Sequence, residues 1–244
     1  VMSNAHVVCR LIDLPVTRAA AFLPESLSVS RGTATASSVV TVKDNGSVLA
    51  LDGDVTLDEV TFAYGAAAWT NLTLDVAVDG MMTDLRNVDI HRGSVSGRVR
   101  GKPIGQVAVG GYADLRAGTN QMACAIKDMT PALFRPLLDP DESNRRLDGL
   151  TINAQFLTEQ LRVTHPMREI AGRVTVVNTR RAGADEWDML AWDLHSQITP
   201  AEVRIKECRV SVTPARFDEN ALRLSGTMYR GRTNAESLVT LYSP

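Results

Sequence analysis

Apolar and polar residues alternate along much of this chain, which is the pattern of a β-sheet with one apolar and one wetted face. In the stretch 72–78, for example, Leu74 and Val76 fall on one side of an extended strand. Thr73 and Asp75 fall on the other side. The period of two residues therefore predicts strands, with the aliphatic side chains gathered on one face.

The clearest turn signal is Asp44-Asn45-Gly46, which separates a strand expected at 33–42 from a return strand expected at 48–57. An Asn-Gly pair between two alternating runs favours a tight hairpin, because both residues tolerate positive φ. Further turns are expected at Asp79-Gly80, Arg92-Gly93 and Ala117-Gly118.

Strand-like segments recur about every ten residues, and this spacing predicts an all-β-dominated fold. We expect a long antiparallel, meandering, twisted sheet that forms an open groove or a sandwich, with one or two short helices. The strands expected after residue 80 are 88–90, 95–99, 106–115, 121–127, 150–156, 160–164, 170–178, 187–198, 202–213, 221–229 and 236–242.

Two short helices are expected between the strands. Thr130 suits an N-cap and Pro131 suits the first helical position, so a helix is expected over 130–138. Pro136 limits its length, because proline lacks the amide hydrogen that continues a helix. A second short helix is expected over 16–23.

The order of these signals repeats along the chain. A short helix with a proline, a glycine-led strand and a second glycine-led strand occur near 21–24 and again near 133–136, roughly 110 to 120 residues later. This repetition predicts two similar β units in series, at 1–128 and 129–244, and the second opens with the short helix.

The second half of the chain contains TPALFRPLLDP, LDGLTINAQFLTEQ and AGRVTVVNTR, and the first half has looser copies, AAAFLPESLSVSRGTATASS and LDGDVTLDEVTF. A short helix followed by glycine-containing strands in this style resembles the periplasmic part of AsmA-like proteins, the repeating-β-groove family of the cell envelope.

The resemblance implies a sheet curled into an open groove that binds or conducts the acyl chains of phospholipid or another lipid and supports outer-membrane homeostasis. It also implies a periplasmic or envelope location in a Gram-negative-type bacterium. The chain opens and closes on strand-like residues, so we expect a piece of a longer protein. Its partners would be lipid, the rest of the parent chain and other envelope proteins, and a segment outside this sequence would anchor it to the membrane.

The composition agrees with a lipid groove. Aromatic residues make up only 5% of the chain, so an apolar face of Val, Leu, Ala and Thr would leave room for hydrocarbon. Each buried methylene contributes about 0.8 kcal/mol. The same faces would also suit a closed sandwich or barrel, and both arrangements remain open at this point. The residues expected to line a groove are Phe62, Leu74, Val76, Val88, Ile90, Ile152 and Val174.

Charge and cysteine content narrow the function further. The formal net charge is −2, which gives no electrostatic footprint for nucleic acid, so no nucleic-acid partner is expected. Cys9, Cys124 and Cys208 lie far apart without the spacing of a metal site. Cys124 and Cys208 fall in strand-like runs, so we expect these two to be buried small apolar residues. No metal and no cofactor is expected.

No catalytic residue is expected either. His195 and Asp193 would share a face of one strand, but no nucleophile accompanies them, so a surface pair is the better interpretation. The acidic segment 139–144 lacks the glycine and the glutamate of an EF-hand loop. The sequence therefore predicts a non-enzymatic lipid-binding segment. The alternative is a structural or adhesive β module that binds protein or glycan.

Overall fold

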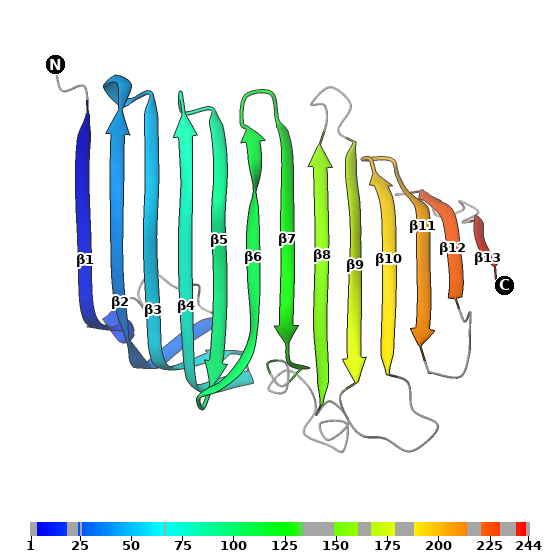
Figure 1. Ribbon diagram of the computed structural model, residues 1–244, viewed down its shortest axis with the longest axis horizontal. Coiled ribbons are helices and arrows are strands. Elements are labelled where there is room, and N and C mark those ends of the chain that lie inside the picture. The colour runs from blue at the N-terminus through cyan, green and yellow to red at the C-terminus, as the bar shows by residue number, and fades with distance from the viewer. Residues whose placement is uncertain are drawn as a thin grey trace. The chain divides into compact units, whose positions relative to one another are not determined.

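The structure is a computed structural model, and it describes residues 4–18, 24, 26–65, 67–131, 133, 149–160, 167–178, 188–213, 221–229 and 238–242. These residues form one open sheet of thirteen strands, in which each strand is hydrogen-bonded to its neighbours in sequence order (Figure 1). The expected all-β antiparallel meander is therefore confirmed. The sheet of the described residues is not closed into a barrel or a sandwich.

The strands are β1 (Ala5–Pro15), β2 (Leu27–Lys43), β3 (Val48–Tyr64), β4 (Ala67–Thr83), β5 (Asn87–Val99), β6 (Lys102–Asp114), β7 (Thr119–Met129), β8 (Leu150–Gln160), β9 (Arg168–Asn178), β10 (Met189–Ile198), β11 (Glu202–Thr213), β12 (Ala221–Tyr229) and β13 (Leu238–Tyr242).

The chain divides into two compact units. Unit 1 comprises Val1–Gly110 and Asp128–Asp148, and unit 2 comprises Gly111–Lys127 and Gly149–Pro244. Unit 1 thus contains β1 to β5 and most of β6, while unit 2 contains most of β7 and all of β8 to β13. The expected pair of similar repeats, 1–128 and 129–244, stays a prediction.

The hairpin expected at Asn45-Gly46 is confirmed. The turn η2 (Asp44–Gly46) joins β2 to β3, and Lys43 lies directly opposite Val48. Asn45 has φ 57° and Gly46 has φ 93°, the left-handed backbone that the Asn-Gly pair accommodates at low cost.

Two of the other expected turns are wrong. Asp79-Gly80 lies inside β4 and Arg92-Gly93 lies inside β5, while the strands turn at 84–86 instead. Glycine serves close packing at these positions: a Cβ on Gly80 would lie 2.8 Å from the carbonyl oxygen of Asp89. Ala117-Gly118, by contrast, does form the turn between β6 and β7.

The two expected helices lie mostly outside the described residues. Residues 16–18 form a single 3-10 turn after β1, and 19–23 lie outside the described part. Pro131 and Leu133 belong to a similar turn, in which the Leu133 amide donates to the Thr130 carbonyl oxygen over 3.1 Å. Residues 134–138 of the expected second helix are outside the described part.

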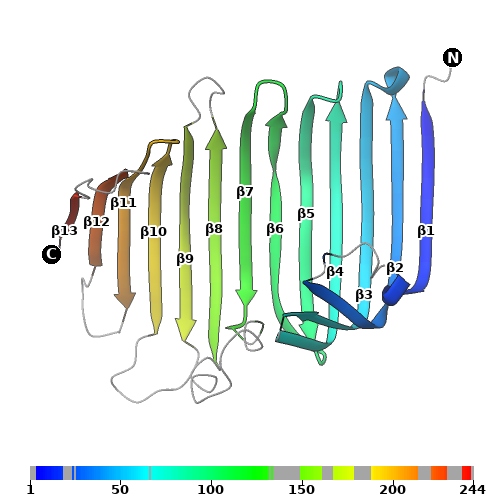
Figure 2. The same ribbon diagram turned by 180° about the vertical axis from the view of Figure 1, so that it is seen from behind.

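A line of backbone irregularities crosses unit 1 near the turn between β3 and β4. The strand registers shift at Arg31 on β2 and between Leu57 and Val60 on β3, and Glu59 and Asn71 have φ of 49° and 54°. Such bulges bend the strands that carry them. The ends of β2, β3 and β4 beyond this line turn out of the plane of their longer parts (Figure 2).

The best-buried side chains of unit 1 gather around this bend. Val60, Leu72 and Ile104 are between 4% and 6% exposed, although the described residues include no large side chain that is fully buried. Elsewhere unit 1 is a single layer of strands. The bend therefore supplies the unit with its small core, and it also shapes the site described next.

Candidate binding face

In unit 1 the strand registers place apolar residues in rows across one face of the sheet. Val55, Val76 and Val95 lie opposite one another on β3, β4 and β5. In the next row toward the β3–β4 turn, Leu57 lies opposite Leu74. We call this surface the apolar face of unit 1, and the opposite surface its wetted face.

The wetted face carries polar ladders between the same strands. The Asp75 carboxylate accepts a hydrogen bond of 3.1 Å from the Thr56 hydroxyl and one of 2.8 Å from the Arg98 guanidinium. The Thr73 hydroxyl donates to Asp58 over 2.9 Å. Cross-strand pairs of this kind favour the observed register, because a slip by one residue would exchange the two faces.

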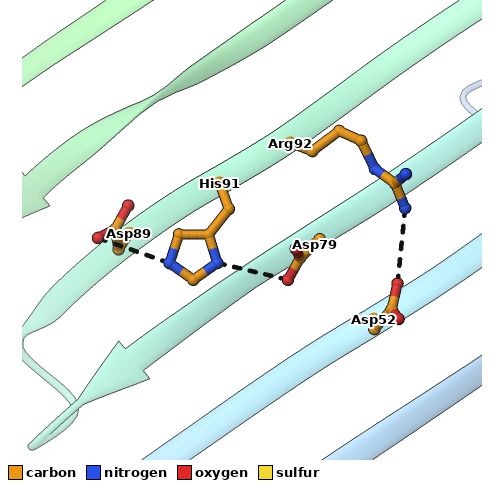
Figure 3. Close-up of polar contacts among 5 residues, drawn as sticks. All are labelled: Asp52, Asp79, Asp89, His91 and Arg92. Carbon is orange, nitrogen blue, oxygen red and sulfur yellow. Dashed lines mark hydrogen bonds and ion pairs between the residues drawn. The ribbon is translucent and has the colours of Figure 1, made fainter.

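A charged cluster on the wetted face surrounds the bulge in β4 and β5 (Figure 3). The ring nitrogens of His91 lie 3.4 Å from Asp79 and 3.7 Å from Asp89, and Arg92 lies 3.7 Å from Asp52. All five side chains are between 44% and 67% exposed, so each pair contributes only ~0–1 kcal/mol. The cluster is a solvated surface and offers no buried acid or base.

The apolar face is left open by the described residues. Leu51, Val78, Val95 and Val109 expose between 36% and 40% of their surface, and all four lie on this face. Scattered apolar residues on a protein surface are ordinary, but a continuous patch indicates a binding surface. The rows of aliphatic side chains on β3, β4 and β5 form such a patch.

Next to the bend, the apolar face is hollowed into a cavity of about 310 Å³. Apolar side chains and glycines line it: Leu74, Val95 and Gly97 form part of its lining, and Phe62 and Trp69 come from the bent ends of β3 and β4. The two aromatic rings lie 5.5 Å apart and are tilted by 37°. The volume falls at the lower end of the range of about 300–1,000 Å³ that is usual for small-molecule sites.

A short segment that begins with the last residue of β7, Met129–Pro131 with Leu133, contributes the remaining wall, and we call it the strap. The Trp69 indole N–H donates to the Leu133 carbonyl oxygen over 2.6 Å, and the Thr130 amide donates to the Ile104 carbonyl oxygen over 2.9 Å. Met129 and Leu133 line the cavity. The strap is therefore held to both sides of the hollow by hydrogen bonds.

Five of the seven residues expected from the sequence, those before residue 100, fall on the apolar face of unit 1. Phe62 and Leu74 line the cavity, and Val76 lies directly opposite Val95, which also lines it. Val88 and Ile90 lie farther along the same face of β5, opposite Met82 and Gly80. No ligand is present, so their role stays a prediction.

Unit 2 has a similar arrangement of faces. Val174 lies between Ala154 and Trp192 in one row, and Ile152 lies opposite Val176 in the next row. The expected groove residues Ile152 and Val174 thus share one face of β8 and β9. Whether that face binds a ligand stays a prediction.

The opposite face of unit 2 carries a carboxylate with a shifted pKa. The Lys206 ammonium donates to Glu169 over 2.8 Å, and the Gln197 amide donates to the same oxygen. These hydrogen bonds, that of Lys206 first, lower the pKa of Glu169 below its ordinary value. His195 lies 4.0 Å from Glu169, while Asp193 pairs with Arg173 over 3.6 Å. His195 and Asp193 therefore have other partners on this face.

Sequence reasoning missed the part of the site that the bend creates. Trp69, Ile104 and Leu133 are far apart in the sequence, and none belongs to the alternating run that identified Leu74 and Val76. One signal was available, because a tryptophan N–H needs a hydrogen-bond partner when it is buried. Its partner, the backbone of Leu133, has no sequence signature.

Several kinds of site are absent from the described part of the chain. No group of three His, Cys, Asp or Glu side chains there is placed to hold a metal ion. Among the helices that the structure describes, none has the length and hydropathy needed to cross a membrane.

The comparisons with known proteins give no relative. No family model matches this chain, and no curated protein or solved structure matches it significantly. The AsmA-like resemblance of the sequence therefore stays an expectation.

Proposed function

We propose that this chain binds the acyl chains of lipids on the apolar face of its sheet and does no catalysis. The observation that carries the proposal is the continuity between the open aliphatic rows and the apolar cavity next to the bend. Val95 belongs to both, because it lies opposite Val76 and lines the cavity.

The length of the face suits hydrocarbon. Along β3 the apolar face runs from Leu49 to Leu57, which are eight residue steps apart, or about 27 Å at ~3.4 Å per step. One leaflet of a bilayer is roughly 15 Å of hydrocarbon, half of the ~30 Å core. A single acyl chain would therefore fit end to end, and each buried methylene would contribute about 0.8 kcal/mol.

The chemistry of the cavity also favours hydrocarbon over a peptide segment. Among the described lining residues, the one N–H or O–H group of a side chain is the Trp69 indole N–H, and that group already donates to Leu133. A peptide backbone entering the cavity would bury amide and carbonyl groups without partners on these side chains, which is unfavourable. An acyl chain brings no such groups.

The wider setting belongs to the same proposal. As a segment of an AsmA-like envelope protein, the chain would hold or conduct phospholipid acyl chains between membranes and support outer-membrane homeostasis. The sequence motifs that resemble this family and the open, single-layer sheet support that setting. Anchoring to a membrane would come from a segment outside this sequence.

Native mass spectrometry of the purified protein, with parallel lipid extraction, tests the proposal. We expect co-purified phospholipid, and we expect Leu74→Asp and Ile152→Asp to reduce its amount without loss of fold. Ala77→Asn is the control, because Ala77 lies opposite Asp54 on the wetted face. A folded protein that carries no lipid and takes up none from added phospholipid vesicles would instead favour the structural or adhesive module.

A further inference from the structure

We infer that the cavity receives the methyl end of a single alkyl chain, so that a bound lipid lies with its tail at the bend and its polar end away from it. This inference rests on the proposed function. It adds the orientation of the bound lipid and a selectivity for ligands whose alkyl chain ends in a methyl group.

The position of the cavity gives the direction. Leu74 and Val95 line the cavity, and Val76, opposite Val95 and two residues after Leu74 on β4, continues from them onto the open apolar face. Phe62 and Trp69 stand at the opposite side, where β3 and β4 approach their turn. A chain that lies along the open face therefore meets the aromatic pair and the strap at its end.

The strap closes the end of the cavity that lies beside the aromatic pair. The Trp69 indole on β4 donates one hydrogen bond of 2.6 Å to the strap, and the Ile104 carbonyl oxygen on β6 accepts one of 2.9 Å from it. Between these bonds the buried Pro131 has no amide hydrogen to leave unpaired. The strap thus closes the hollow without presenting a free donor from these groups to the ligand.

Charge is absent from the lining. Among the described residues that line the cavity there is no Asp, Glu, Lys, Arg or His, whereas the wetted face of the same strands carries many charged side chains. A carboxylate placed there would lose its hydration with nothing to replace it, and burial of an unpaired charge is strongly unfavourable. A methyl group has no such hydration to lose when it enters the cavity.

Glycine at position 97 keeps the cavity open. A Cβ added to Gly97 would lie 2.8 Å from Cδ1 of Ile104 and 3.1 Å from Cδ2 of Leu74. Gly97 does not have the positive φ that would itself exclude other residues. A valine at this position would therefore fill the floor of the cavity while leaving the backbone conformation permitted.

Photo-crosslinking with two fatty-acid probes tests the orientation on the intact chain. One probe carries a diazirine at its methyl end, and the other carries the diazirine next to its carboxylate. We expect the methyl-end probe to label Met129 or Leu133 at least tenfold more than the carboxylate-end probe. Equal labelling of the strap by both probes would overturn the inference but leave lipid binding intact. If neither probe labels any part of the chain, the proposed function fails as well.

Competition between ligands tests the selectivity. We expect an α,ω-dicarboxylic acid to bind at least 100-fold more weakly than the monocarboxylic acid of equal length, because its second carboxylate would have to enter the cavity. Gly97→Val should reduce the ratio of the two affinities to less than tenfold, because the valine side chain would keep the methyl end of the monocarboxylic acid out of the cavity. Equal affinity of the two acids for the unmodified protein would contradict the inference.

Discussion

The indole Nε1–H of Trp69 donates a hydrogen bond of 2.6 Å to the carbonyl oxygen of Leu133, across 64 residues of sequence. Trp69 stands on the bent end of β4, and Leu133 follows β7 in the strap. This bond and the one from Thr130 to Ile104 hold the strap over the apolar cavity. The most enclosed part of the apolar face therefore depends on contacts between distant segments.

Trp69→Phe tests the stabilising effect of that hydrogen bond. The substitution keeps an aromatic ring beside Phe62 but leaves the Leu133 carbonyl without its donor. We expect the free energy of unfolding to fall by about 0.5–1.5 kcal/mol, the usual net value of one hydrogen bond. Urea unfolding followed by far-ultraviolet circular dichroism measures the change.

Tyr64→Phe is the matched control, because Tyr64 also lies near this turn but is 52% exposed. Its loss of a hydroxyl should change the free energy of unfolding by less than about 0.5 kcal/mol. Equal effects of the two substitutions would show that the bond from Trp69 does not secure the strap.

Gly105→Ala tests the close approach of β6 to the strap. Gly105 has φ 123°, and a Cβ there would lie 2.5 Å from Cα of Met129. Gly101, with φ 75°, has no atom within 4 Å of such a Cβ, so Gly101→Ala introduces the unfavourable backbone angle alone. We expect Gly105→Ala to lower the free energy of unfolding by about 1–3 kcal/mol more than Gly101→Ala.

The same urea experiment compares the two alanine variants. Similar urea midpoints and unfolding slopes for both variants would mean that the strap moves away from residue 105 without loss of stability. In that case the cavity would not be a fixed feature of unit 1.

Stability in acid should depend on Glu169. Its pKa is lowered in the folded state, first by the hydrogen bond from Lys206 and then by that from Gln197. A lowered pKa stabilises the fold at pH values above the ordinary value of 4.5, and this contribution is lost as the pH falls through the folded-state pKa. Denaturant titrations at a series of pH values measure it.

Glu169→Gln should remove this contribution, so the difference in unfolding free energy between the protein and the variant should shrink as the pH is lowered below 4.5. Lys206→Met should have a similar effect, because it removes the main cause of the lowered pKa. A difference that stays constant with pH would contradict the assignment.

The alternation of the sequence predicted the strands and their faces well, because a residue's side of a strand follows from its position alone. It failed at Gly80 and Gly93, since a glycine that allows close packing looks the same in sequence as a glycine in a turn. It also gave no sign of the bend. Glu59 adopts φ 49° there, although glutamate has no particular preference for that backbone region.

The cavity was predictable only in part for the same reason. Phe62 and Leu74 were identified from alternation, and they line it. The strap was not identified, because its attachment uses the backbone groups of Thr130, Ile104 and Leu133. Backbone hydrogen bonds between distant segments leave little trace in the residue types that make them.

The most direct test of lipid binding by the apolar face compares two neighbouring positions on β4. Val76→Asn places an amide on the apolar face, and Ala77→Asn places the same amide on the wetted face. Isothermal titration calorimetry with a long-chain fatty acid measures both variants and the unmodified protein. We expect Val76→Asn to weaken binding about tenfold or more, because an unpaired amide costs about 1–3 kcal/mol against hydrocarbon, and we expect Ala77→Asn to bind normally. Equal affinities of the two variants, or no binding by the folded unmodified protein, would contradict the claim that this face binds acyl chains.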